Sequence, residues 1–163
     1  MTIEPNHTSF ASLFSPAEVI CRTEEKDRDK ILHELVELLS LRRGIGDVEK
    51  AHRAVLARED DMPTIVAAGM AMPHARLETI KDLVVGVATS PDGIVYDPRR
   101  PDALVKLIIL TLTPMHSPFA YLQAIGSVAR ICLAPSTPDV IAALPTPEQV
   151  WSFFDKGETL GSG

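Results

Sequence analysis

The chain has 163 residues, of which 45% are hydrophobic and 23% are charged, so it is long enough to bury a core without disulfides or a structural metal. Its formal net charge of −6 argues against binding to nucleic acid and favours a cationic protein partner. No apolar run could cross a membrane, and residues 1–14 lack the layout of a signal peptide, so we predict a cytoplasmic protein without membrane insertion. Cys21 and Cys132 have neither redox nor metal-ligand spacing, and we predict no cofactor or metal.

No repeat, low-complexity block or proline-rich linker divides the chain. We therefore predict one domain over residues 13–156, with a poorly ordered leader over 1–12 and a frayed tail over 157–163. The oligomeric state is not predicted.

The first third of the chain has helical periodicity. Residues 27–43 place their apolar side chains on one stripe, and Gly44 follows as a stop signal. A second helix is predicted over residues 47–60, with Asp47 as its N-cap.

Strand character follows these helices. Residues 64–72 form an apolar run, and residues 83–88 and 104–113 are rich in β-branched and other apolar residues, as buried strands are. Between the last two runs, Ser-Pro-Asp-Gly at 90–93 predicts a turn and residues 97–101 predict a loop.

The last third returns to helical periodicity. A helix is predicted after Pro114, ending at Pro135. Two short helices follow, with Thr137 and Thr146 as N-caps before prolines. In the helix after Pro114, the predicted apolar face consists of Tyr121, Leu122, Ile125, Val128, Ala129 and Cys132. This order of elements predicts an α/β protein whose central sheet is covered by helices on both sides.

His74 is the strongest candidate for chemistry. Pro73 fixes its own φ and biases Met72 toward extended geometry, so the backbone that presents the ring has little freedom. Such a ring can act as a nucleophile, although a solvated or merely satisfied histidine fits the same pattern. The pair Glu59-Asp60 is expected on solvated helix surface. Surface or packing roles are assigned to His7, His33 and His52. Nucleotide-binding, hydrolase and zincin motifs are absent.

Several features occur in a fixed order around this histidine. An Arg58-Glu59 pair precedes Thr64, and an apolar-Ala-apolar-Pro-His sequence follows at 70–74. A strand over 83–88 and a terminal helix over 147–154 come after it.

In these features the chain resembles, over residues 13–156, the fructose/mannitol type of enzyme IIA of the bacterial phosphotransferase system, including the stand-alone nitrogen-regulatory members. The resemblance implies a central mixed β-sheet flanked by helices on both sides. It also implies a phosphocarrier that accepts a phosphoryl group on His74, at Nε2, from the phosphocarrier protein HPr. The group then passes to an enzyme IIB, or the phosphorylated state regulates a target protein. A phosphohistidine intermediate would make the chain a phosphotransferase component; the residues alone leave its standing as an enzyme open.

The resemblance gives roles to two further residues. Arg58 is assigned to the phosphoryl charge, because a guanidinium offers two parallel donors to phosphate oxygens. Thr64 is a candidate for a further hydrogen bond from its hydroxyl. Both keep an alternative from the residues alone: Arg58 as a solvated helix-end cation and Thr64 as a turn or cap residue.

The chain departs from the family pattern at four positions. Pro63 replaces a serine, and Ile65 and Ala67 stand where the family has turn glycines, so the loop must avoid positive φ there. By spacing, Tyr121 takes the position of the family's second active-site histidine, and tyrosine cannot become a cation near neutral pH.

His116 is a possible substitute for that second histidine, or else an exposed loop residue. If neither His116 nor Tyr121 stabilises the phosphorylated ring, the chain would be a non-catalytic regulatory module that kept the fold and lost efficient transfer. A metal site formed by His74 and His116 is a third hypothesis, weakened by the lack of further spaced ligands.

Overall fold

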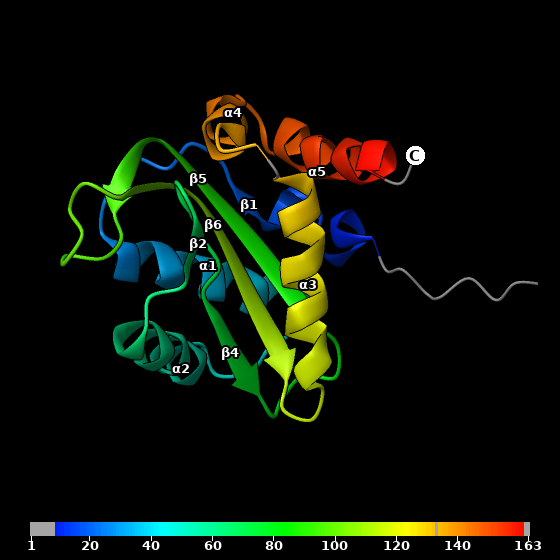
Figure 1. Ribbon diagram of the computed structural model, residues 1–163. Coiled ribbons are helices and arrows are strands. Elements are labelled where there is room, and N and C mark those ends of the chain that lie inside the picture. Colours follow the sequence, from blue (N-terminus) through cyan, green and yellow to red (C-terminus); the bar gives the residue numbers. More distant parts are fainter. Residues whose placement is uncertain (1–8, 133, 162–163) are drawn as a thin grey trace, which may run out of the picture.

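The computed structural model describes residues 9–132 and 134–161 (Figure 1). Short 3-10 helices, η1 (Phe10–Leu13) and η2 (Pro16–Glu18), open the described chain. The α-helices are α1 (Arg28–Arg43), α2 (Val48–Asp61), α3 (Pro118–Ile131), α4 (Thr137–Ala143) and α5 (Pro147–Gly161). The strands are β1 (Val19–Ile20), β2 (Ile65–Ala67), β3 (Met70–Ala71), β4 (His74–Leu77), β5 (Val84–Val95) and β6 (Leu104–Pro114).

The strands form one mixed sheet in the order β1-β5-β6-β3-β2. β4 also pairs with β6, farther along that strand than β3 does. The long central pair, β5 and β6, is antiparallel, whereas β3 and β4 both run parallel to β6. One apolar cluster joins α1 and α2 to one face of the sheet, and a second joins α3, α4, α5 and η1 to the other. The predicted α/β architecture, with helices on both faces of the sheet, is therefore confirmed (Figure 1).

The first two helices follow their sequence signals closely. The side chain of Asp27 caps α1, and the side chain of Asp47 caps α2 by accepting from the backbone N–H groups of Glu49 and Lys50. The first helix ends at Gly44, whose φ of 66° is a left-handed conformation that glycine adopts without strain.

The predicted turn at 90–93 is wrong, because these residues continue β5. The pairing with β6 shifts register between Thr89 and Ile94, and Gly93 takes a φ of 79° in the irregular stretch. Ile94 then pairs with Val105. The chain therefore absorbs its turn-forming residues as a local irregularity between two segments of β5 that pair with β6.

The helices after β6 differ from prediction in their details. α3 ends at Ile131, ahead of Pro135, and its buried residues are Ala124 and Val128, whereas Leu122, predicted on the apolar face, is 63% exposed. Ala129 is exposed as well. The N-cap position of α4 is Ser136, so Thr137 already lies inside the helix.

Ordered structure extends into the stretches predicted as leader and tail. Phe10 is fully buried and its ring centre lies 5.3 Å from that of Phe154, so the chain is packed well before residue 13. The indole N–H of Trp151 donates to the carbonyl of Phe14 over 2.9 Å and thereby ties α5 to this segment. α5 runs on to Gly161 through residues expected in the tail. Residues 1–8, which include His7, and residues 162–163 lie outside the described part of the chain.

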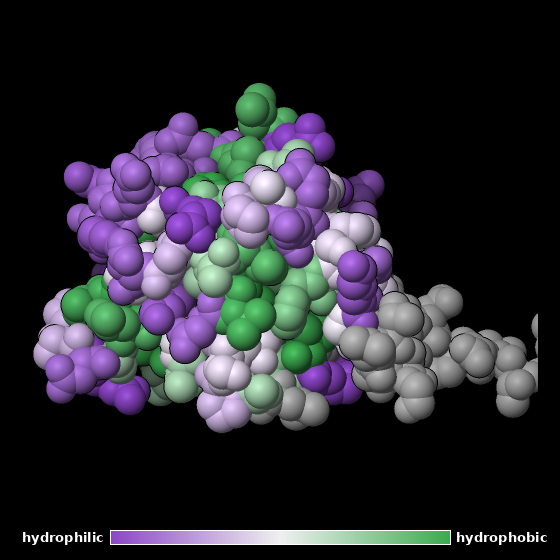
Figure 2. Space-filling view, turned by 90° about the horizontal axis from the view of Figure 1, so that it is seen from above, coloured by the Kyte–Doolittle hydropathy of each residue, from purple (hydrophilic) through white to green (hydrophobic). Residues whose placement is uncertain are grey.

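The surface is mainly hydrophilic over the end of the molecule where α4 and α5 lie, with a strip of hydrophobic residues between hydrophilic ones (Figure 2). In the described part of the chain, no helix combines the length and the apolar character needed to cross a membrane.

Candidate functional site

His74 is the first residue of β4, where it pairs with Thr111 of β6. Successive side chains of a strand point to opposite faces, and Ala75 and Leu77 lie in the apolar cluster under α1 and α2. His74 and Arg76 therefore point to the other side of the strand. His74 is only partly buried there.

Arg58, in the last turn of α2, reaches the same ring. Its Nε–H donates to His74 Nε2 over 3.2 Å. A guanidinium can only donate hydrogen bonds, so Nε2 must be the acceptor and the neutral ring carries its proton on Nδ1. No carboxylate within the described residues forms an ion pair with Arg58. The N–H groups that do not contact His74 are therefore available to an anion.

Tyr121, in the first turn of α3, stacks on His74 with ring centres 3.8 Å apart and planes inclined by 24°. Its hydroxyl donates to the carbonyl of Met72 over 3.0 Å and does not contact the histidine. Burial raises the pKa of Tyr121 to about 12, so this side chain is neutral at physiological pH. Tyr121 thus stacks on His74 and hydrogen-bonds to the backbone of Met72, but it does not supply a positive charge.

The electrostatics of the site keep His74 neutral. Burial lowers the pKa of His74 to about 4, the positive charges of Arg58 and Arg76 act in the same direction, and the backbone of Met72 opposes them. Nδ1 is buried and forms no hydrogen bond of good geometry. The lone pair on Nε2 is therefore not lost to a proton at neutral pH.

Glu59 is fully buried, so its predicted place on the solvated helix surface is wrong. Its carboxylate accepts from the hydroxyl of Tyr96 at 2.6 Å, and from both the backbone N–H and the hydroxyl of Thr64 at 3.1 and 2.7 Å. The hydroxyl of Thr64 thus donates its proton to a hydrogen bond with Glu59. A sequence signal was present, because Glu59 follows Ala51 and Val55 at four-residue spacing on the buried stripe of α2.

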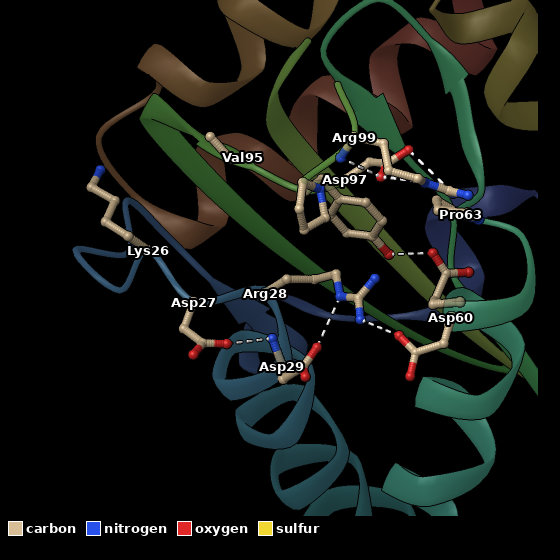
Figure 3. A pocket seen from close by; sticks show the side chains of 12 residues that line it. Lys26, Asp27, Arg28, Asp29, Asp60, Pro63, Val95, Asp97 and Arg99 are labelled. Carbon is tan, nitrogen blue, oxygen red and sulfur yellow. Dashed lines mark hydrogen bonds and ion pairs between the residues drawn. The ribbon is translucent and has the colours of Figure 1, made fainter. Parts of the chain in front are cut away.

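Glu59 also lines a cavity of about 520 Å³ whose lining does not include His74 (Figure 3). Arg28 bridges Asp29 and Asp60 there, with N–O distances of 2.9 and 2.7 Å, and its guanidinium lies over the Tyr96 ring. Arg99 pairs with Asp97 at the opposite wall. Both arginines are thus paired with carboxylates, and Arg28 links the start of α1 to the end of α2.

The segment that leads to His74 reverses direction at Gly69. This residue has a φ of 81° between β2 and β3, and its carbonyl accepts from the N–H groups of Lys106 and Leu107. The N–H of Met72 donates to the carbonyl of Thr64 over 2.8 Å. One glycine is thus enough for the reversal, even though Ile65 occupies a position where the family has glycine.

His116 is exposed and is not brought to His74. Leu77 at the end of β4 pairs with Pro114, and the N–H of Met115 donates to the carbonyl of Leu77. His116 follows beyond that end, while His74 lies at the beginning of β4, so roughly 10 Å of strand separates them. This placement removes the basis both for His116 as a substitute second histidine and for a metal site shared with His74.

Exposed apolar side chains occur close in sequence to two residues that contact His74, Tyr121 and Arg58. Phe119 and Leu122, which flank Tyr121 in α3, are 72% and 63% exposed. Met62, just after the last turn of α2, is 71% exposed. Exposed apolar residues beside an open polar centre are typical of a surface that docks another protein.

Comparisons with known proteins point in one direction. Residues 12–157 match the family described as the phosphoenolpyruvate-dependent sugar phosphotransferase system, EIIA 2. The fructose-specific EIIA component of Haloferax volcanii is 28% identical over 120 residues, which are 73% of this chain and 77% of that protein. The 2-O-alpha-mannosyl-D-glycerate-specific EIIABC component of Escherichia coli is 24% identical over 83% of the chain, which spans only 21% of that longer protein.

Solved structures show the same fold. The nitrogen regulatory protein IIA-Ntr of Neisseria meningitidis aligns with a TM-score of 0.77 at 19% identity, covering 88% of this chain and 97% of that one. IIA mannitol of Escherichia coli aligns with a TM-score of 0.73 at 18% identity, covering 86% and 98%. The same enzyme, in its complex with phosphorylated IIB mannitol, aligns with a TM-score of 0.75 at 16% identity, covering 88% and 97%.

Proposed function

Because the chain belongs to the EIIA 2 family of the phosphoenolpyruvate-dependent sugar phosphotransferase system, we propose that it is a phosphocarrier whose phosphoacceptor is Nε2 of His74. The observation that carries the assignment is the hydrogen bond from Arg58 Nε to that nitrogen. It selects the tautomer that carries no proton on Nε2, and Arg58 moves from the lone pair to the phosphoryl oxygens when the donor arrives.

The step is an in-line transfer between two nitrogens. The Nε2 lone pair attacks the phosphorus of a phosphohistidine donor, while the N–P bond of the donor breaks and its electron pair returns to the donor ring. The His74 ring keeps its proton on Nδ1, and the resulting ring charge is balanced by the phosphoryl oxygens. No separate base is needed, because the ring is already neutral.

Arg76 extends the positive charge around the acceptor. It lies two residues after His74 on the same face of β4, it is exposed, and its charge already acts on the ring. A residue two positions along a strand is roughly 7 Å away, which a guanidinium side chain can span. Since Tyr121 is neutral, Arg58 and Arg76 together are assigned to the phosphoryl charge.

Partners follow from the family and from the surface. We assign the donor to an HPr-like phosphocarrier, and the acceptor to an enzyme IIB or a regulated target protein. A similar protein, IIA mannitol, has been solved in complex with phosphorylated IIB mannitol. The exposed apolar side chains of Phe119, Leu122 and Met62 are better suited to contact with a protein surface than with a free sugar. The proposed exchange takes place in the cytoplasm and serves sugar transport or nitrogen regulation.

The direct test is phosphoryl uptake from labelled phosphoenolpyruvate in the presence of enzyme I and HPr, under alkaline conditions that preserve phosphohistidine. Label on the natural chain and none on His74→Ala is the expected result. His116→Ala is the matched control and should be labelled like the natural chain. Equal labelling of His74→Ala would refute the assignment.

A second function is favoured by one observation: Tyr121 stacks on His74 with its hydroxyl directed to Met72, and none of the histidines in the described part of the chain takes that place. In that case the chain is a non-catalytic regulatory module that binds HPr or a target protein. It predicts binding without phosphoryl uptake by the natural chain, and rapid stoichiometric labelling would exclude it.

A further inference from the structure

A second histidine cluster lies where α1 packs against α2. His33 comes from α1, and Glu49 and His52 come from the first half of α2. One ligand atom from each of these three side chains can be chosen so that all lie within 4.8 Å of one another. Sequence analysis assigned both histidines to surface or packing roles, since nothing local brings residue 33 to residue 52.

In each of the two imidazoles, one ring nitrogen lies next to a hydrogen-bond acceptor. His52 Nε2 lies 3.0 Å from the carbonyl oxygen of Asp29, which can only accept, so Nε2 carries the proton and Nδ1 keeps a lone pair. His33 Nδ1 lies 2.6 Å from a carboxylate oxygen of Glu37, which leaves Nε2 facing Glu49 Oε1 at 2.8 Å. A backbone carbonyl or carboxylate on the far nitrogen is the usual support of a metal-bound histidine.

The mutual placement of the rings also fits a shared metal. Their centres are 4.8 Å apart and their planes are inclined by 85°. Two imidazoles on one Zn²⁺, with Zn–N bonds of about 2.0–2.1 Å and a near-tetrahedral angle, have ring centres roughly 5 Å apart. Glu49 supplies a carboxylate oxygen as the third ligand, and its exposed position leaves room for water as the fourth.

We propose that His33, Glu49 and His52 form a binding site for one divalent cation that prefers imidazole ligands, with Zn²⁺ as the favoured ion. Binding replaces any proton that His33 shares with Glu49, and the carboxylate oxygen moves by some tenths of an ångström to admit the ion. The bound ion links α1 to α2, the helix that carries Arg58 at its other end. Nitrogen and oxygen ligands without thiolate also accept Cu²⁺ or Ni²⁺, so the choice among these ions follows their availability.

The test is a calorimetric titration of the full chain, free of any histidine tag, with Zn²⁺ alone. The expected result is one equivalent bound, with at least tenfold weaker binding in His33→Gln and in His52→Gln. Co²⁺ should give the intense visible absorption of a four-coordinate site. Zn²⁺ should also raise the melting temperature of the natural chain and not that of the two variants.

Two further variants separate a built site from scattered surface histidines. Glu37→Gln touches no proposed ligand position and should weaken Zn²⁺ binding about tenfold through the loss of its support to His33. His116→Ala, which removes an exposed histidine elsewhere, should bind as the natural chain does. Binding that survives in the folded His33→Gln/His52→Gln double variant, or the absence of binding in the natural chain, overturns the proposal. The titration does not depend on phosphoryl transfer.

Discussion

His33 and His74 are the same residue in opposite surroundings. His33 lies between the carboxylates of Glu49 and Glu37, and the hydrogen bond to Glu49 raises its pKa above the usual value. His74 is partly buried beside Arg58 and Arg76, and its pKa falls to about 4. The contrast shows that burial and neighbouring charges, both determined by the fold, set the chemistry of each ring.

The largest difference should appear in an NMR titration of the two rings. His33 should titrate above pH 6.5 and His74 near pH 4, so their midpoints should lie more than two pH units apart. Similar midpoints for the two rings would break the comparison.

The same contrast has opposite consequences for stability. Between pH 6.5 and 4 the unfolded chain binds a proton at His74 that the folded chain does not, so this residue lowers the free energy of unfolding as pH falls. His33 contributes stability below its unfolded pKa and loses it as pH rises through its higher folded pKa. Urea unfolding of His74→Gln between pH 4 and 6.5, and of His33→Gln from pH 6.5 upward, should remove each trend separately.

Replacing Arg58 by glutamine should slow phosphoryl uptake about 10²–10³-fold, the usual cost of removing one donor from a developing charge. It should also raise the pKa of His74, because the neighbouring positive charge is gone. Arg53→Gln, on an exposed part of α2, is the matched control and should change neither quantity. An unchanged rate in Arg58→Gln would return that residue to a solvated helix-end cation.

Glu59→Ala should lower the free energy of unfolding by roughly 2–3 kcal/mol, because the buried Tyr96 hydroxyl and the N–H of Thr64 lose their acceptor. Urea unfolding measures it. Glu34→Ala, an exposed site on α1, should stay within about 0.5 kcal/mol of the natural chain. A small effect at Glu59 would mean that water replaces the carboxylate.

Arg76→Gln should reduce phosphoryl uptake about tenfold, less than Arg58→Gln, because Arg76 makes no contact with the ring before phosphorylation. Its effect should appear in the stability of the phosphorylated form toward hydrolysis as well as in the rate of uptake. If hydrolysis is unchanged while binding to HPr is weaker, Arg76 belongs to the docking surface.

Tyr121→Phe should have the smallest effect. The ring stack is kept and one hydrogen bond to the carbonyl of Met72 is lost, at a cost of about 1 kcal/mol in unfolding free energy. Phosphoryl uptake should fall only a few-fold. Tyr121→His restores the cation-capable residue of the family, and faster uptake in that variant would show that the tyrosine limits transfer.

Local patterns predicted much of this fold. The bounds of α1 and α2 follow from apolar periodicity and aspartate caps, because both signals act within one helix. The turn at 90–93 was not found because β5 pairs with β6 on both sides of it, at Thr89 and at Ile94, so these residues form an irregularity within the strand. The exposed face of α3 was misjudged, since apolar character alone does not say which residues another element covers.

Site residues were predictable only where a motif carried them. His74 was singled out by the proline before it and Arg58 by the family resemblance, and the structure places them in contact. Glu59 was misplaced because a charged residue on an apolar stripe needs partners, Tyr96 and Thr64, that sequence periodicity does not show. The pairing of His33 with His52 depends on how two helices pack, which no local pattern records.

The most direct test of the central claim is ¹⁵N and ³¹P NMR of the phosphorylated chain, which identifies the nitrogen that carries the phosphoryl group. The account predicts one phosphoryl group on Nε2 of His74, with the proton retained on Nδ1. A phosphoryl group on Nδ1 of His74, or on any other residue, would contradict it.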